Sequence, residues 1–161
     1  MPVLITAASH AEAYKIERLL QLPDVIFGDH EELPHLSFSG RKFIRIPQGN
    51  SASYAHEILD LALNSSVHKI IPLYADEVLP LAEARQLFAE YGISVLVPSL
   101  LWVKQHLSDG INRLSEPIVI EAGKVIAGQL PEKALLPEEN FSGIFQVESD
   151  KDIFAFKLFT V

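Results

Sequence analysis

The sequence has 161 residues, 48% of them hydrophobic, and a formal net charge of −8 at pH 7. This length suits one domain with a small appendage, and the hydrophobic content is enough for a sizeable core. No block of Lys or Arg is present, so we expect no nucleic-acid partner and no anionic membrane surface. The absence of Cys excludes disulfides, thiolate nucleophiles and Cys-ligated zinc.

The sequence opens without a basic segment, and Asp, Glu or His interrupts every long apolar run. We therefore expect neither a signal peptide nor a membrane span. A cytoplasmic location is the prediction that follows.

Strands and helices alternate strictly over the first hundred residues. Apolar runs predict strands at 3–7, 25–27, 42–46, 69–73 and 93–97. Apolar residues at helical spacing predict helices at 10–22, 52–64 and 99–107, and another that Asp76 caps and Gly92 ends. This α/β alternation predicts a Rossmann-like parallel sheet with helices on both faces.

The pattern changes after Gly110. Residues 117–121 and 124–127 read as one hairpin, and residues 143–148 and 153–160 as a second. We therefore predict a Rossmann-like domain over 1–110 and a small antiparallel β extension over 111–161 at the C-terminus.

The run from Ile153 to Val161 is apolar on both strand faces. Such a strand is either internal to a small mixed sheet or lies at an interface between two copies. We favour a homodimer formed through the C-terminal strands. Its predicted apolar anchors are Phe145, Phe154, Phe156 and Phe159.

The turn after the first strand reads Ala7-Ala8-Ser9-His10, where a dinucleotide site has G-x-G-x-x-G. Without glycine the backbone cannot approach a pyrophosphate closely, so we expect no NAD, FAD or other cofactor. The helix N-terminus could still hold one phosphate or carboxylate. The simpler interpretation is that Ser9 only caps the helix, in a capping box with Glu12.

Asp29 follows the second strand, about twenty residues after this turn, which is the spacing of a ribose-binding acid. We favour the alternative that Asp29 is a solvated acid in a turn. The run from Asp29 to His35, with His30 and Pro34, gathers two histidines and three carboxylates. Its spacing matches no metal signature, so we predict a solvated acidic loop and no metal site.

Tyr74, Asp76 and Glu77 follow the fourth strand, which should flank the first at the switch point of the sheet. We expect Asp76 to cap the next helix and Glu77 to face the same crevice as His10. These two form the best candidate for a catalytic acid/base pair. The loop 47–51 is either a lid over the rim or an ordinary connection.

The crevice is predicted to bind a small anionic or polar ligand. The candidate ligand-binding residues are Ala8, Ser9, His10, Asp29, His30, Gln48, Asn50, Tyr74, Asp76, Glu77 and Ser99.

Residues 3–99 resemble the preATP-grasp domain, the Rossmann-like amino-terminal unit of ATP-grasp ligases such as carbamoyl-phosphate synthase and biotin carboxylase. The resemblance rests on the order and spacing of several segments. These are Val3-Leu4-Ile5-Thr6-Ala7-Ala8, Val25 to Asp29, Ile46-Pro47 with Tyr54, Ile70 to Leu79, and Gly92 to Ser99. It implies an ATP-grasp module with a phosphate-binding Lys, a Gly-rich loop and acidic Mg²⁺ ligands, for which residues 100–161 are too few.

Three functions follow from these observations. The first is a non-catalytic ligand-binding or accessory subunit of preATP-grasp type that acts with a separate ATP-grasp enzyme. The second is a homodimeric small-molecule sensor, and the third is a small hydrolase or isomerase that uses His10 and Glu77.

Overall fold

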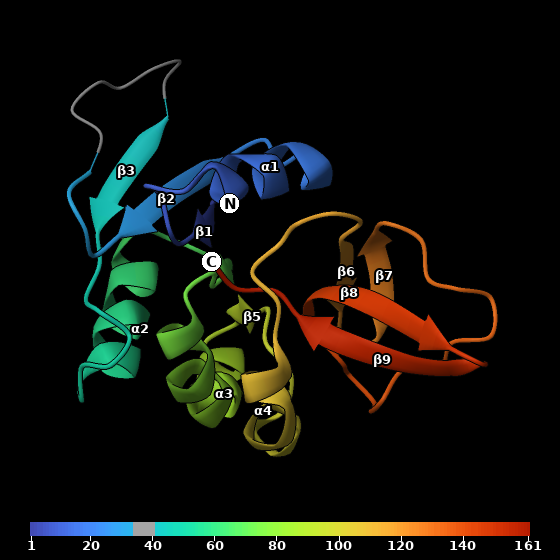
Figure 1. Cartoon of the computed structure of the whole chain (residues 1–161). Coiled ribbons are helices and arrows are strands. Elements are labelled where there is room, and N and C mark those ends of the chain that lie inside the picture. Colours follow the sequence, from blue (N-terminus) through green and yellow to red (C-terminus); the bar gives the residue numbers. More distant parts are fainter. Residues whose placement is uncertain (34–40) are drawn as a thin grey trace.

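The computed structural model describes residues 1–33 and 41–161. Its first sheet is fully parallel, with strand order β3-β2-β1-β4-β5 (Figure 1). The strands are β1 (Val3–Ile5), β2 (Val25–Asp29), β3 (Lys42–Arg45), β4 (Lys69–Ile71) and β5 (Ser94–Val95). The predicted Rossmann-like sheet is therefore confirmed, and β1 and β4 are neighbours at its switch point.

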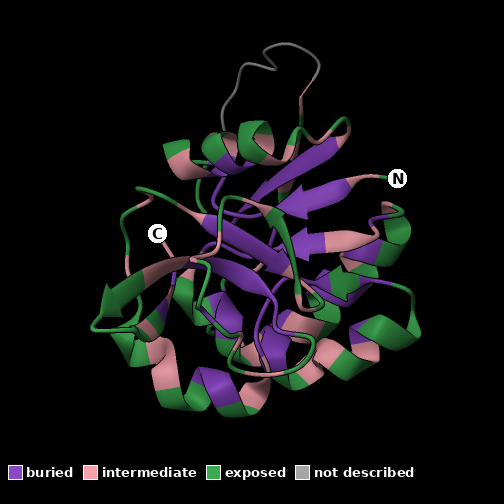
Figure 2. Cartoon of the chain, turned by 90° about the vertical axis from the view of Figure 1, so that its right-hand side faces the viewer, coloured by how far each residue is buried: buried purple, intermediate pink, exposed green. Residues whose placement is uncertain are grey.

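The four α-helices of the described ranges follow the predicted order. They are α1 (Ala11–Leu20), α2 (Tyr54–Asn64), α3 (Ala75–Glu90) and α4 (Leu100–His106), which a 3₁₀ turn (Leu107–Asp109) extends. Alternate residues of β1 point to opposite faces of the sheet and show which helices cover each face. Leu4 belongs to the core under α2 and α3, whereas Val3 and Ile5 belong to the core under α1. The helices thus cover both faces of a buried sheet and expose their outer sides (Figure 2).

Strand β5 is shorter than the predicted 93–97. The amide of Leu96 still donates to the carbonyl of Ile70 at 2.9 Å, but the amide of Val97 turns back to Val95. The chain therefore leaves the sheet at this point to begin α4.

A second sheet is antiparallel, with strand order β7-β6-β8-β9. Its strands are β6 (Ile118–Glu121), β7 (Lys124–Ala127), β8 (Gly143–Asp150) and β9 (Ile153–Leu158). The turn between β8 and β9 contains only Lys151 and Asp152, both with positive φ (46° and 66°). This geometry joins two twisted strands tightly, so β8 runs two residues further than predicted.

The antiparallel sheet shares its cores with the first hundred residues. Ile118 and Phe145 belong to the same buried cluster as Trp102 of α4, and Val119 and Ile144 to the cluster under α1. The predicted extension is thus confirmed as an antiparallel sheet, and it packs into the cores of the parallel one.

The predicted dimer anchors are wrong for three of four residues. Phe145, Phe156 and Phe159 are only 0%, 7% and 2% exposed. Phe145 stacks on Phe141 with ring centroids 4.4 Å apart, so its apolar surface is already covered within the chain. Only Phe154 is half-exposed on β9, which is an edge strand and not an internal one.

No helix in the described part of the chain is both long and apolar enough to cross a membrane.

Candidate functional site

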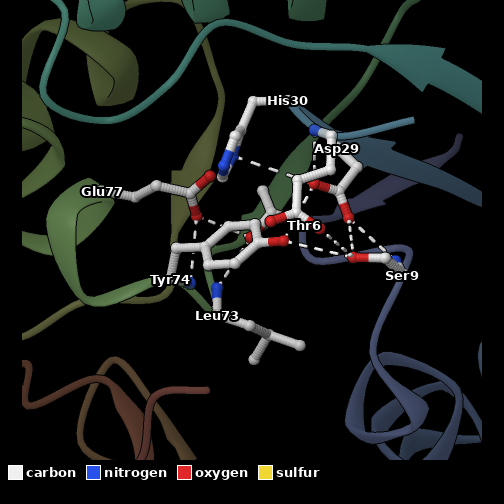
Figure 3. A network of polar contacts seen from close by, with 8 residues as sticks. Thr6, Ser9, Asp29, His30, Leu73, Tyr74 and Glu77 are labelled. Atoms are coloured by element: carbon white, nitrogen blue, oxygen red, sulfur yellow. Dashed lines mark hydrogen bonds and ion pairs between the residues drawn. The ribbon is translucent and has the colours of Figure 1, made fainter. Parts of the chain in front are cut away.

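The carboxyl ends of β2, β1 and β4 bring three short segments together. These are the turn after β1, the end of β2, and the start of α3 (Figure 3). Several of the predicted ligand-binding residues meet here. They are Ser9, Asp29, His30, Tyr74 and Glu77.

The carboxylate of Asp29 accepts four hydrogen bonds. The Ser9 amide and hydroxyl donate to Oδ2 at 2.8 and 2.7 Å. The Tyr74 hydroxyl and the Glu31 amide donate to Oδ1 at 2.9 and 3.0 Å. A carboxylate has about four acceptor sites, so every site on Asp29 is occupied.

Asp29 is also fully buried. The prediction of a solvated turn acid is therefore wrong. Burial alone would raise the pKa of its carboxyl. The hydrogen bonds from Glu31, Ser9 and Tyr74 outweigh that effect and hold the pKa below its usual value.

The turn after β1 explains why Ser9 is free to bind Asp29. Ala7 has φ 60° and lets the chain reverse tightly, and the Ala8 amide and carbonyl are bonded to Gly28 and Tyr14. Helix α1 begins only at Ala11, with no side-chain cap. The predicted capping by Ser9 is wrong because its hydroxyl donates to Asp29 instead.

Glu77 is buried within α3, with no exposed side-chain surface. Its Oε2 accepts from the Thr6 hydroxyl at 2.6 Å and from the Tyr74 amide at 3.3 Å (Figure 3). Thr6 Oγ1 in turn accepts from the Leu73 amide at 2.8 Å. Burial raises the pKa of Glu77 to about 8, so its carboxyl is mostly protonated at neutral pH.

Two polar atoms beside this cluster have no hydrogen-bond partner among the described residues. They are Glu77 Oε1 and the hydroxyl of Tyr54. The two groups interact without reaching hydrogen-bond geometry. Burial raises the pKa of Tyr54, and Glu77 raises it further.

The predicted cap at Asp76 is wrong. The helix begins at Ala75, and Tyr74 is its N-cap residue. Glu77, three residues on, accepts from the Tyr74 amide and so bonds the start of the helix. Asp76 is exposed in the first turn.

Two histidines flank the ring of Tyr74. His30 lies 4.6 Å from it and His10 lies 5.6 Å from it, centroid to centroid. Nδ1 of His30 is 3.8 Å from Asp29 Oδ1, within ion-pair distance but beyond hydrogen-bond reach, and it has no hydrogen-bond partner among the described residues. Among the described residues, no hydrogen bond, ion pair or ring contact joins His10 to Glu77, and their role as an acid/base pair stays a prediction.

The loop 47–51 packs against the first turn of α3. A Cβ built on Gly49 would lie 2.6 Å from the carbonyl carbon of Asp76. Gln48 and Asn50, on either side of it, are exposed. The loop therefore covers the start of α3, while no side-chain hydrogen bond joins Gln48 or Asn50 to the described residues around Asp29.

Ser99 stands apart from this group. Its hydroxyl accepts from the Trp102 amide at 3.2 Å and donates to Glu138 Oε2 at 2.5 Å. Its amide donates to the other oxygen of Glu138 at 2.9 Å. Ser99 is therefore a helix cap that ties α4 to the loop before β8.

In the described ranges, no three His, Asp or Glu residues are arranged to hold a metal ion. Pro34 and His35, from the predicted acidic loop, lie outside those ranges. Two hollows of about 530 and 650 Å³ lie elsewhere, one beside β6 and the other between α3 and α4. Between the opening turn and Tyr74, where the crevice was expected, Ser9 Oγ lies 3.3 Å from the Tyr74 hydroxyl and so bridges the two segments.

Sequence reasoning missed Thr6 and Tyr54 as members of this site. Each carried a weak signal, because Thr6 is a polar residue in an apolar strand and Tyr54 is a hydroxyl on an inward helix stripe. No protein-family model matches the chain, and no curated protein matches it. The likeness to the preATP-grasp domain therefore stays a prediction from the sequence.

Proposed function

We propose that this chain is a non-catalytic accessory subunit of preATP-grasp type, which binds a separate ATP-grasp enzyme. The observation that carries the proposal is the saturation of Asp29. In Rossmann-like folds the acid at the end of the second strand is available to a ligand hydroxyl. Here Ser9, Glu31 and Tyr74 occupy all of its acceptor sites, so a ligand would have to displace one of them.

Polar groups that bond one another hold a surface in a fixed shape. The tied segments present an ordered rim at the strand ends, which suits contact with a partner protein more than turnover of a substrate. Glu77, the only strongly shifted carboxyl in the described ranges, is fully buried and cannot reach a substrate in this arrangement.

The test is reconstitution with an ATP-grasp enzyme that lacks its own amino-terminal domain and is encoded beside this chain. We expect the two to co-purify and the added chain to increase ATP consumption. The variant Gln48→Arg adds bulk and charge at the exposed rim and should weaken the complex. The control, Asp60→Arg on α2, should not. Absence of a complex at micromolar concentration would contradict the proposal.

A second function, a small-molecule binding module, is favoured by a different observation. His30 Nδ1 is a buried side-chain nitrogen without a hydrogen-bond partner in the described part of the chain, and it lies beside Asp29 and Tyr74. Buried polar groups are normally bonded, and a small ligand that forms a hydrogen bond with this nitrogen would satisfy it. A thermal-shift screen of nucleotides, amino acids and dicarboxylates tests this idea, because a saturating ligand stabilises by several kcal/mol. A flat response would contradict it.

A further inference from the structure

Strand β9 has an open outer edge. Strand β8 pairs with its inner side over the whole length, without a register shift. On its outer side, the described residues contribute one backbone bond, from the Ile111 amide to the Leu158 carbonyl at 2.9 Å. The edge is therefore closed at Leu158 and open over residues 153–157. Figure 1 shows β9 at the outer side of its sheet, beside β8.

The direction of each backbone group on β9 follows from two bonds. The Phe159 amide donates inward to the Ile144 carbonyl of β8 at 2.8 Å, whereas the Leu158 carbonyl faces outward. Alternate residues of an antiparallel strand point their backbone groups to opposite sides. Phe156 and Phe154 alternate with Leu158 at a spacing of two residues, so their N–H and C=O groups point to the same side as the Leu158 carbonyl, which is the open side.

The open segment reads Ile-Phe-Ala-Phe-Lys, with a Phe on each side of Ala155. We propose that this edge pairs antiparallel with the same edge of a second copy, about a two-fold axis at Ala155. Phe154 of each copy then exchanges two backbone hydrogen bonds with Phe156 of the other.

Only this register uses both outward residues of each copy. An axis at Phe154 would place Asp152, which has a positive φ in the turn, opposite Phe156. An axis at Phe156 would place Leu158, already bonded to Ile111, opposite Phe154.

The side chains suit this pairing on both faces. On one face each half-exposed Phe154 gains an aromatic cross-strand neighbour, Phe156 of the second copy. On the other face Ile153, which is 72% exposed, lies opposite the stem of Lys157. The small Ala155 permits close approach at the axis. A hollow of about 380 Å³ between this edge and α4 leaves room along it.

A single-cysteine experiment tests the axis, because the chain has no Cys. In Ala155→Cys the two thiols would face each other in a non-hydrogen-bonded pair, within disulfide reach. The matched control, Ile153→Cys, places an exposed thiol on the same edge opposite Lys157. We expect mild oxidation to link Ala155→Cys into a dimer at least tenfold more efficiently than Ile153→Cys. Equal cross-linking of the two variants would overturn the register.

Charge reversal provides the second test. Ala155→Lys places like charges face to face at the axis and should give a monomer in sedimentation velocity. Mixing it with Ala155→Glu should restore a dimer. Val125→Lys adds the same charge to the far edge strand, β7, and should remain dimeric. Wild-type protein that sediments as a monomer at micromolar concentration, or a dimer that Ala155→Lys leaves intact, would overturn the proposal.

Discussion

The hydroxyl of Tyr74 donates to Oδ1 of Asp29 at 2.9 Å, and so ties the start of α3 to the end of β2 across the intervening strand β1. Because Asp29 also fixes the turn after β1 through Ser9, one carboxylate holds three chain segments at the switch point.

Tyr74→Phe removes the hydroxyl and leaves the ring between its histidine neighbours. A hydrogen bond to a charged acceptor contributes about 2 kcal/mol, so the free energy of unfolding should fall by roughly that amount. Urea denaturation measures it. Tyr91→Phe, at a tyrosine that is 56% exposed, is the matched control and should change little. Equal stability of the two variants would show that the Tyr74 bond contributes nothing.

Asp29→Asn replaces an acceptor of four hydrogen bonds by a group with two acceptor sites and two donors. The amide would face donors, so we expect a loss of about 3 kcal/mol in unfolding free energy near neutral pH. Asp60→Asn on the exposed face of α2 is the control.

The same variant should alter the acid dependence of stability. The folded pKa of Asp29 is lowered, so its contribution is present above the unfolded pKa of about 3.9 and is lost as the pH falls through the folded pKa. The wild type should therefore lose its advantage over Asp29→Asn on acidification below about pH 4. An unchanged difference in unfolding free energy at low pH would contradict the assignment.

The positions of the strands and helices were predictable because apolar periodicity depends on burial, which the sequence records directly. The contacts of Ser9, Asp29 and Tyr74 at the strand ends were not predictable in this way. Whether Ser9 caps a helix or bonds Asp29 depends on how near two carboxyl strand ends come, and both uses satisfy the same hydroxyl. Nor does spacing show that Glu77 rather than Asp76 bonds the helix start, since one residue of shift exchanges their roles. In both cases the local sequence allows two hydrogen-bonding arrangements, and the distance between segments in the folded chain decides which one forms.

The dimer anchors failed for a related reason. A strand that is apolar on both faces is expected to be buried on both faces. Here the chain's own aromatic residues bury much of that apolar surface, as the stacking of Phe141 on Phe145 illustrates. The sequence indicates that Phe156 is buried and does not indicate against what. What the described residues leave uncovered on β9 is its outer backbone edge over residues 153–157.

Gly49→Ala tests the contact between the loop 47–51 and α3. The backbone of Gly49 is not in the left-handed region, so the cost is steric, from a Cβ only 2.6 Å from the Asp76 carbonyl carbon. Overpacking of this kind costs about 1–3 kcal/mol, measured as a lower midpoint in urea. Asn50→Ala, at the exposed next residue, should stay within about 0.5 kcal/mol of the wild type. A wild-type midpoint for Gly49→Ala would mean that the loop moves freely off the helix.

Glu77→Gln tests whether the fold holds this carboxyl in its neutral form. The folded pKa of about 8 lies above the unfolded one, so the stabilisation by protonation is complete below about pH 4.3. It is lost as the pH rises toward the folded pKa and stays lost above it. Each unit of pKa difference corresponds to about 1.4 kcal/mol, so the wild type should become several kcal/mol less stable across this window.

Gln has the shape of the neutral acid, retains an acceptor for Thr6 and does not titrate. Urea denaturation at about pH 5 and about pH 9 should therefore show a fall in stability for the wild type that Glu77→Gln lacks, with the variant the more stable protein at high pH. Parallel pH profiles for the two proteins would mean that Glu77 is ionised in the fold at neutral pH.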